Sequence, residues 1–197
     1  MYPYQCDLAD ISSVQSMFEW IKNHPDLGRL NICICNAGFA IAKPLTELSP
    51  EEMKGMTNVN VISSAFCAQM SIKMMLDQEI DGQVIFIGST MGNEIPDDFK
   101  MSFYSSTKHA LKVLMEGFRK EMKSLGSKIR IGSISPGLVK TEALEAMTQN
   151  AEIAQMIYET NPHINADDLT EILWQMITCK PYVQVQDVTV RHVHDKL

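Results

Sequence analysis

An α/β fold with a doubly wound parallel sheet is predicted by the order of patterns along the 197-residue chain. Short apolar runs with the length of strands alternate with longer segments of helical periodicity. Several of these runs end in small or polar residues, as strands do where they enter loops. Strands that alternate with helices form parallel sheets covered on both faces. At this length we expect one domain with a single core.

Local signals place the elements of the N-terminal half. Asp10 is a good N-cap for a helix that continues to about Lys22. Ser49-Pro50-Glu51-Glu52 starts a second helix, because proline suits the first helical position and acids favour the positive end of the dipole. This helix reaches about Asp77, and Gly55 is a candidate point of interruption. The expected strands are Tyr4–Cys6, Leu30–Cys35 and Gln83–Ile87.

The C-terminal half continues the alternation. Ser102 is expected to cap a helix that runs to Leu125, with Gly126 directly behind it. One or two helices are expected over residues 141–159, and another over Asp167–Cys179. The remaining strands are Ile129–Ile134 and Val183–Val190, the second of which shows the alternation of a strand.

Tyr104 and Lys108 suggest a proton-transfer site together with Ser89. Residues four apart on a helix share one face. A free phenol titrates near ~10, and a neighbouring ammonium is expected to lower that pKa toward neutral pH. Ser89 follows an apolar strand, at the carboxyl edge where open α/β sheets bind ligands. Taken alone, the same residues also fit a solvated Tyr–Lys pair and a serine in a turn.

Further motifs surround this set in a fixed order. They are Asp7-Leu8, Asn36-Ala37-Gly38, Asn60, Pro136-Gly137 and Thr141. With Ser89 and the Tyr104–Lys108 pair, they resemble the short-chain dehydrogenase/reductase family from about residue 4 to the C-terminus. The resemblance is greatest to the animal branch that acts on ketosteroids or farnesol-type alcohols. It implies a Rossmann-like fold and hydride transfer between NADP(H), with NAD(H) also open, and a secondary alcohol or ketone.

The resemblance also implies catalytic roles. Tyr104 is expected to be the general acid in reduction and the general base in oxidation. Lys108 would lower the pKa of Tyr104 and hydrogen-bond the nicotinamide ribose. Ser89 would hold the substrate oxygen, with Thr90 as a distant alternative, and Asn60 would anchor a water that connects Lys108 to solvent. Without the resemblance, Asn60 fits a polar residue satisfied inside a helix equally well.

Cofactor contacts follow from the same resemblance. Asp7 and Leu8 would meet the adenine, and Asn36, Ala37 and Gly38 the adenosine ribose. The nicotinamide end would meet Pro136, Gly137 and Thr141. Gly38 also fits a tight turn that needs positive φ. The family's usual Asn-Asn-Ala-Gly motif reads Cys-Asn-Ala-Gly here, a mild departure that keeps Asn36.

A larger departure lies at the N-terminus. The family's first strand, Gly-rich turn, helix and second strand have no counterpart, so we expect a domain truncated at its N-terminus. The strand Leu30–Cys35 should then have an open edge, and a strand at Tyr4 no partner. A fragment of a complete enzyme is favoured. The alternative is a non-catalytic isoform that acts as an interaction or regulatory subunit.

Composition narrows the function classes. The chain has 17 basic and 24 acidic residues and a net charge of -7, which argues against nucleic acid as a partner. Its five cysteines lack metal-ligand spacing, so we expect no metal site and reduced thiols in a cytoplasmic protein. No apolar run approaches the ~20 residues of a membrane span.

Two expectations concern partners. The segment after Pro136-Gly137, which closes over the active site in this family, is rich in Met and Leu, which suits a small lipophilic substrate such as a steroid, isoprenoid or retinoid. Packing of this segment onto the core would explain most of the same residues. The helices 59–77 and 102–125 carry apolar residues around more than one face, and we therefore expect a homodimer or homotetramer through them.

Overall fold

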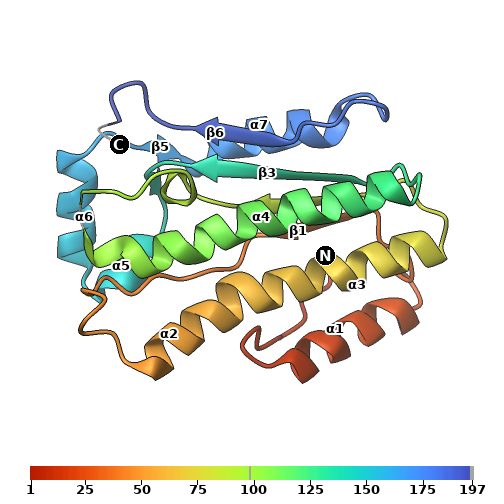
Figure 1. Cartoon of the computed structure of the whole chain (residues 1–197), viewed down its shortest axis with the longest axis horizontal. Coiled ribbons are helices and arrows are strands. Elements are labelled where there is room, and N and C mark those ends of the chain that lie inside the picture. Colours follow the sequence, from red (N-terminus) through yellow and green to blue (C-terminus); the bar gives the residue numbers. More distant parts are fainter. Residues whose placement is uncertain (98, 196–197) are drawn as a thin grey trace.

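The computed structural model describes residues 1–97 and 99–195, and its main sheet confirms the α/β, Rossmann-like fold. Four parallel strands lie in the order β1-β2-β3-β6. Their bounds are Ile32–Cys35, Gln83–Ile87, Arg130–Pro136 and Asp187–Val190. Figure 1 shows the arrowheads of β3 and β6 pointing the same way. Because all neighbouring strands pair in parallel, the carboxyl ends of the four strands share one edge of the sheet.

Successive residues of a strand point to opposite faces of the sheet, so apolar side chains lie on both faces. Helices cover both faces of this sheet. Val84 and Phe86 of β2 pack against α3 (Ser64–Asp77) and α4 (Ser102–Ser124) in one core. Ile85, on the opposite face of β2, packs against Met176 of α7 (Ala166–Thr178). The sheet is therefore doubly wound, as the alternating pattern predicted.

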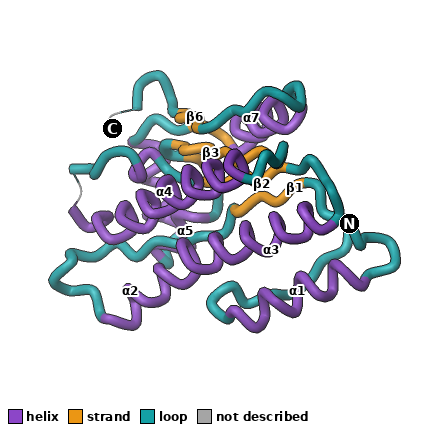
Figure 2. Tube along the Cα trace, turned by 45° about the vertical axis from the view of Figure 1, so that its right-hand side comes forward, coloured by secondary structure: helices purple, strands orange, loops and turns teal. Residues whose placement is uncertain are grey.

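The N-terminal segment differs from the prediction. Residues 4–6 form no strand and pair with none in the described structure, so the strand expected at Tyr4–Cys6 is wrong. The segment packs instead against α1 (Ile11–Asn23), where the rings of Tyr4 and Trp20 lie 5.0 Å apart. A strand needs a neighbour for its backbone hydrogen bonds, and this segment has none. Figure 2 shows α1 outside α3, and Val14 and Phe18 join the two helices.

The open edge expected for the strand at residues 30–35 is present. Strand β1 pairs with β2 alone in the described part of the chain. Ile32 and Ile34, on the face turned away from α3, are 39% and 40% exposed. The opposite face of β1 is covered, because Cys35 packs with Ala68 and Ile72 of α3.

The long helix begins as predicted and changes type in its middle. Ser49 caps α2 (Pro50–Thr57) in a capping box with Glu52. A π-helical segment, Asn58–Ser63, then joins α2 to α3. The interruption therefore lies near Gly55, as expected, but begins after residue 57. Gly55 stays inside α2 because helices tolerate a single glycine at a modest cost.

This helical stretch, Pro50–Asp77, is by length and composition the one described helix that could cross a membrane. Core helices of soluble proteins pass the same test, so the observation is weak support for a span. Its α3 part packs on β1 and β2, as Ala68 and Met75 show.

The remaining boundaries show smaller differences. Ser102 is the first residue of α4 and not its cap, and its hydroxyl donates to the Phe99 carbonyl. Gly126 ends that helix with a φ of 66°, as expected. The expected helical region over 141–159 consists of α5 (Ala143–Thr148) and α6 (Ala151–Thr160). Strand β6 begins four residues later than predicted, and a small second sheet pairs β4 (Val139–Lys140) with β5 (Ile164–Asn165).

Candidate functional site

The fold brings the predicted catalytic residues to the carboxyl edge of the sheet. Ser89 follows β2, and its hydroxyl accepts from the Met91 backbone at 3.2 Å, which opens a short 3₁₀ turn over Thr90–Gly92. Tyr104 and Lys108 lie on the first two turns of α4, one above the other. Asn60 lies in the π-helical segment that crosses α4.

Lys108 is a buried ammonium with an incomplete set of hydrogen bonds. Lys108 is only 5% exposed, and its Nζ donates to the Ile87 carbonyl at 2.9 Å. An ammonium has three N–H donors, and no second acceptor for Nζ is found in the described part of the chain. Burial lowers the pKa of Lys108 to about 8, so the group still carries its proton at neutral pH. A buried donor of this kind favours a ligand that brings acceptor oxygens.

Tyr104 lies beside this ammonium, with Nζ of Lys108 5.7 Å from the ring centroid. Burial raises the pKa of Tyr104 to about 12, and a hydrogen bond with Ser89 opposes this rise. The net shift of the Tyr104 pKa is therefore opposite to the lowering that we expected from Lys108. Desolvation of the phenolate outweighs the hydrogen bond with Ser89, because burial removes water that would otherwise stabilise the negative charge.

Asn60 is fully buried and joins three elements. Its Oδ1 accepts from the Phe39 backbone at 3.0 Å, and its Nδ2 donates to the Phe39 carbonyl at 2.9 Å and to Thr107 Oγ1 at 3.0 Å. The side chain therefore holds the loop after β1 against α4. Pattern reasoning missed both partners, because nothing in the local sequence links Phe39 and Thr107 to residue 60. π-helical segments are often found at functional sites.

The loop after β1 lies directly over Lys108. A Cβ on Gly38 would lie 3.2 Å from Asn60 Oδ1 and 3.4 Å from Lys108 Nζ, so glycine keeps the approach to the ammonium open. Asn36 and Ala37, which precede it, are exposed. The structure thus places the predicted Asn36-Ala37-Gly38 motif next to the predicted catalytic residues.

The other predicted cofactor residues are divided between two places. Pro136 is buried at the end of β3, and the Gly137 amide donates to the Val190 carbonyl at 2.8 Å. Thr141 is exposed just beyond β4, and its amide donates to the Tyr158 hydroxyl at 3.1 Å. These three residues belong to the same carboxyl edge as Ser89.

Asp7 and Leu8 are not joined to this edge by any contact that we find in the described residues. Asp7 is exposed, and its carboxylate accepts from the Ala9 backbone at 2.9 Å in the turn before α1. Leu8 packs with Val14 and Phe18. Both residues therefore have a structural role at the start of α1.

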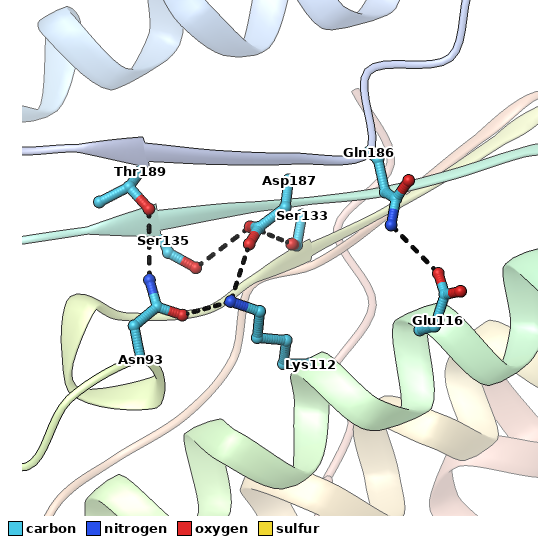
Figure 3. Close-up of polar contacts among 8 residues, drawn as sticks. All are labelled: Asn93, Lys112, Glu116, Ser133, Ser135, Gln186, Asp187 and Thr189. Carbon is cyan, nitrogen blue, oxygen red and sulfur yellow. Dashed lines mark hydrogen bonds and ion pairs between the residues drawn. The ribbon is translucent and has the colours of Figure 1, made fainter.

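A polar network behind the site was not predicted (Figure 3). Asp187 accepts from Ser133 at 2.7 Å, and Lys112 lies 3.2 Å from its other oxygen. Lys112 also donates to Asn93 at 2.7 Å, and Asn93 donates to Thr189 at 3.2 Å. The network ties α4, β3 and β6 to the turn that follows Ser89. Sequence reasoning had no signal for it, because its members are distant in the chain.

A model of the short chain dehydrogenase family matches residues 1–152. Dehydrogenase/reductase SDR family member 11 of Bos taurus is 33% identical over 97% of this chain and 75% of its own length, and that of Gallus gallus is 34% identical with the same coverage. Farnesol dehydrogenase of Aedes aegypti is 25% identical over the whole chain and 76% of its own length.

Solved structures show the same fold. The closed form of serine dehydrogenase complexed with NADP+ superposes with a TM-score of 0.87 over 96% of this chain and 75% of that chain, at 22% identity. An alcohol dehydrogenase from the archaeon Thermococcus sibiricus, complexed with 5-hydroxy-NADP, superposes with a TM-score of 0.81 over 98% of this chain and 75% of that chain, at 20% identity. At these identities the likeness concerns the fold.

Proposed function

Because the chain belongs to the short chain dehydrogenase family, we propose that it is an oxidoreductase that transfers hydride between a nicotinamide cofactor and a secondary alcohol or ketone. The observation that carries this proposal is the grouping of Ser89, Tyr104 and Lys108 at one edge of the sheet, with a buried ammonium short of acceptors. In a solvated Tyr–Lys pair the ammonium would be in contact with water, whereas Lys108 is buried.

The residues at this edge fit a nicotinamide cofactor. The two remaining N–H groups of Lys108 suit ribose hydroxyls, and Gly38 leaves the approach to them free. In the proposal, Asn36, Ala37 and Gly38 contact the adenosine ribose, and Pro136, Gly137 and Thr141 contact the nicotinamide end. When bound, the cofactor supplies or accepts the hydride. Asp7 and Leu8 remain the proposed adenine contacts.

The protein's own part in the reaction is proton transfer and positioning. With a pKa of about 12, the Tyr104 phenol holds its proton at neutral pH and is therefore a donor, which suits reduction of a carbonyl. The Ser89 hydroxyl, which hydrogen-bonds Tyr104, holds the substrate oxygen within reach of the same proton. When Tyr104 gives up its proton it becomes a phenolate. Lys108, once ligand oxygens accept its free N–H groups, places a positive charge beside that phenolate. Asn60 fixes the loop over Lys108.

We propose NADP(H) as the cofactor, with NAD(H) as the alternative. Solved neighbours of the same fold are complexed with NADP+ and with NADH, so the fold accommodates either cofactor. Titrating NADPH and NADH separately against the protein, with nicotinamide fluorescence as the signal, decides between them. Tighter binding of NADH would reverse this choice.

A lipophilic substrate is supported by the segment that follows Gly137. Helix α6 exposes Ile153 and Met156, which are 42% and 56% exposed. Apolar side chains on a segment next to a site favour an apolar ligand. Farnesol dehydrogenase of Aedes aegypti, by its name, acts on such an alcohol.

The test of the proposed activity is Tyr104→Phe, with Tyr182→Phe as the matched control. Tyr182 is 81% exposed on a distant loop, so its hydroxyl is not expected to matter. Oxidation of NADPH would be followed with a ketosteroid, farnesal and a small keto acid. We expect Tyr104→Phe to lose at least ~100-fold in kcat/KM and the control to keep full activity. Substantial turnover by the Tyr104 variant would remove it from its role.

We also propose that copies of the chain associate as a homodimer or homotetramer through the helices 59–77 and 102–125. An open groove of about 540 Å³ lies along α4, lined among others by Val113, Glu116 and Gly117 of that helix and by Gln186 before β6. Val113 is 73% exposed and Ile62, on the neighbouring π-helical segment, is 46% exposed. The groove is also lined by the charged residues Lys112, Lys120 and Asp187. Exposed apolar side chains with charged residues around them favour a two-fold contact with a second copy.

Val113→Lys tests this association, and Val193→Lys is its control because Val193 is 88% exposed outside the groove. We expect light scattering to show a dimer or tetramer for the parent and the control, and monomers for Val113→Lys. A monomeric parent at micromolar concentration would contradict the proposal. Phe66 is a poorer probe, because it packs with Val14 and Phe18 and its substitution would disturb the fold.

A cytoplasmic location completes the proposal. Its support is chemical: all five cysteines are free, including the neighbouring pair Cys33 and Cys35. Free thiols persist where the compartment is reducing.

A further inference from the structure

The 3₁₀ turn Thr90–Gly92, which follows Ser89, lies directly on α4. At its start, Ser89 forms a hydrogen bond with the side chain of Tyr104. One helical turn further along α4, the backbone of Gly92 lies against that of Lys108, because a Cβ on Gly92 would be 2.9 Å from the Lys108 carbonyl oxygen. The Gly92 amide donates to the Ser89 carbonyl at 2.8 Å. The position of the turn on α4 therefore decides how Ser89 faces Tyr104.

Lys112, one helical turn beyond Lys108, holds the other end of this turn (Figure 3). Its Nζ donates at 2.7 Å to Oδ1 of Asn93, the residue that ends the turn. Residues 104, 108 and 112 are four apart, so they follow one another along the same side of α4. The turn is therefore attached to three successive turns of the helix.

The ammonium of Lys112 is itself held in place by Asp187. One carboxylate oxygen of Asp187 lies 3.2 Å from Nζ, and the other accepts at 2.7 Å from Ser133, which is buried on β3. A lysine side chain has a flexible stem, and acceptors on two sides restrict it to one position. Asn93 also donates to Thr189 of β6 at 3.2 Å. The end of the turn is therefore held both by α4 and by the sheet.

The contact between Lys112 and Asn93 is local in its effect. Helix α4 is fixed on the sheet by its apolar face, where Leu111 and Met115 are buried in the core. A surface ion pair adds little to the stability of such a helix, and the side chain of Lys112 is 47% exposed. Loss of the Lys112 ammonium should therefore leave the fold intact and release the end of the turn.

We propose that Lys112 is a positioning residue of the oxidoreductase site, which acts through Asn93, is held by Asp187, and sets the turn on α4 so that Ser89 faces Tyr104. This inference rests on the proposed function, in which Ser89 holds the substrate oxygen for proton transfer from Tyr104. Without the ammonium, the turn is free to shift along α4. A small displacement of a group that holds the substrate is costly in rate.

Lys112→Met tests this role, with Lys123→Met as the matched control. Methionine removes the ammonium and keeps an unbranched side chain, and Lys123 lies on the last turn of the same helix, outside the groove. With NADPH and the carbonyl compound that the parent reduces, kcat and kcat/KM should fall together by at least ~10-fold in Lys112→Met. The KM for NADPH should change less than ~2-fold, since this loss affects the transition state alone. Lys112→Arg, which keeps a cation with several donors, should recover most of the rate.

Amide hydrogen exchange, measured by NMR, reports on the turn without cofactor or activity. The amides of residues 92–94 donate to the carbonyls of Ser89 and Thr90. In Lys112→Met these amides should exchange at least ~5-fold faster, whereas those of β2, which is paired on both sides, should keep their rates. Lys123→Met should change neither set. If the parent shows no turnover, the proposed function fails, and faster or unchanged exchange at the turn then supports or overturns the role of Lys112.

A double-mutant cycle tests the route through Asn93. Asn93→Ala should slow the reaction as much as Lys112→Met does, and the double variant should be no slower than either, because both changes remove one contact. Additive losses would overturn the proposal, as would an unchanged kcat in Lys112→Met. A lower kcat with unchanged exchange at the turn would overturn it too, because the loss would then come through the groove along α4, which Lys112 also lines.

Discussion

Replacing Lys108 by methionine should make the fold more stable while it abolishes the proposed activity. The pKa of Lys108 falls from 10.5 to about 8 through burial, and the residue is 5% exposed. Keeping this buried group charged at pH 7 costs about 3 kcal/mol of folding free energy, from the difference between the two pKa values. Methionine has a similar length and carries no charge. The Ile87 carbonyl loses its donor, at a cost of about 1 kcal/mol.

The net gain is about 2 kcal/mol at pH 7, or about 5 °C in Tm for a chain of this size. The gain should depend on pH in a defined direction. The unfolded lysine binds its proton up to pH 10.5 and the folded one only to about 8, so the cost of charging is full below 8 and fades above it. At pH 10 the cost falls to about 1 kcal/mol, which leaves Lys108→Met no more stable than the parent.

Urea unfolding of the parent and of Lys108→Met at pH 7 and pH 10 measures this difference. Other groups titrate equally in both proteins, so the comparison isolates residue 108. An unchanged difference between the two pH values would mean that packing, and not charge, distinguishes the variants. A variant less stable than the parent at pH 7 would refute the reasoning, because Lys108 would then stabilise the fold.

Three further substitutions test the packing around the site. Gly132→Ala should destabilise the protein by about 1–3 kcal/mol in urea unfolding, because the new Cβ would lie 2.5 Å from the Val185 carbonyl oxygen. Gly117 lies on an exposed face of α4, and a new Cβ there would have nothing within 4 Å, so Gly117→Ala should instead stabilise the protein by up to about 1 kcal/mol. A change of the same sign for Gly132→Ala and Gly117→Ala would contradict this reasoning. Thr107→Val should cost about 1–3 kcal/mol, since it leaves the buried Asn60 amide without one acceptor. A neutral result in thermal unfolding would show that water replaces the hydroxyl.

The sequence predicted well what local patterns encode. The helix start at Ser49, the end of α4 at Gly126 and the four strands of the main sheet all depend on residues within one turn or one strand. The resemblance placed Ser89, Tyr104 and Lys108 together because chains with the same order of motifs have the same topology. The prediction of a strand at Tyr4 was wrong because a segment becomes a strand only beside a partner, and the local sequence does not show whether a partner is present.

The chemistry of the site was less predictable than its position. The pKa of Tyr104 depends on how much water the folded chain removes from the ring, which no spacing of residues encodes. Likewise, the contact between Lys112 and Asp187 forms only after α4 and β6 have packed on the sheet. The π-helical segment has no sequence signal that we can identify. Its position is known only from the backbone of the folded chain.

That segment also sets the phase between two halves of one helix. Each residue of an α-helix turns the chain by about 100°, and a π turn absorbs one residue more than an α turn. Deleting a single residue within Asn58–Ser63 would convert the segment to an α-helix and rotate α2 by about that angle relative to α3. Met56, now fully buried, would swing toward solvent while α3 stayed on the sheet. The helix therefore tolerates substitution in this segment more readily than any change in its length.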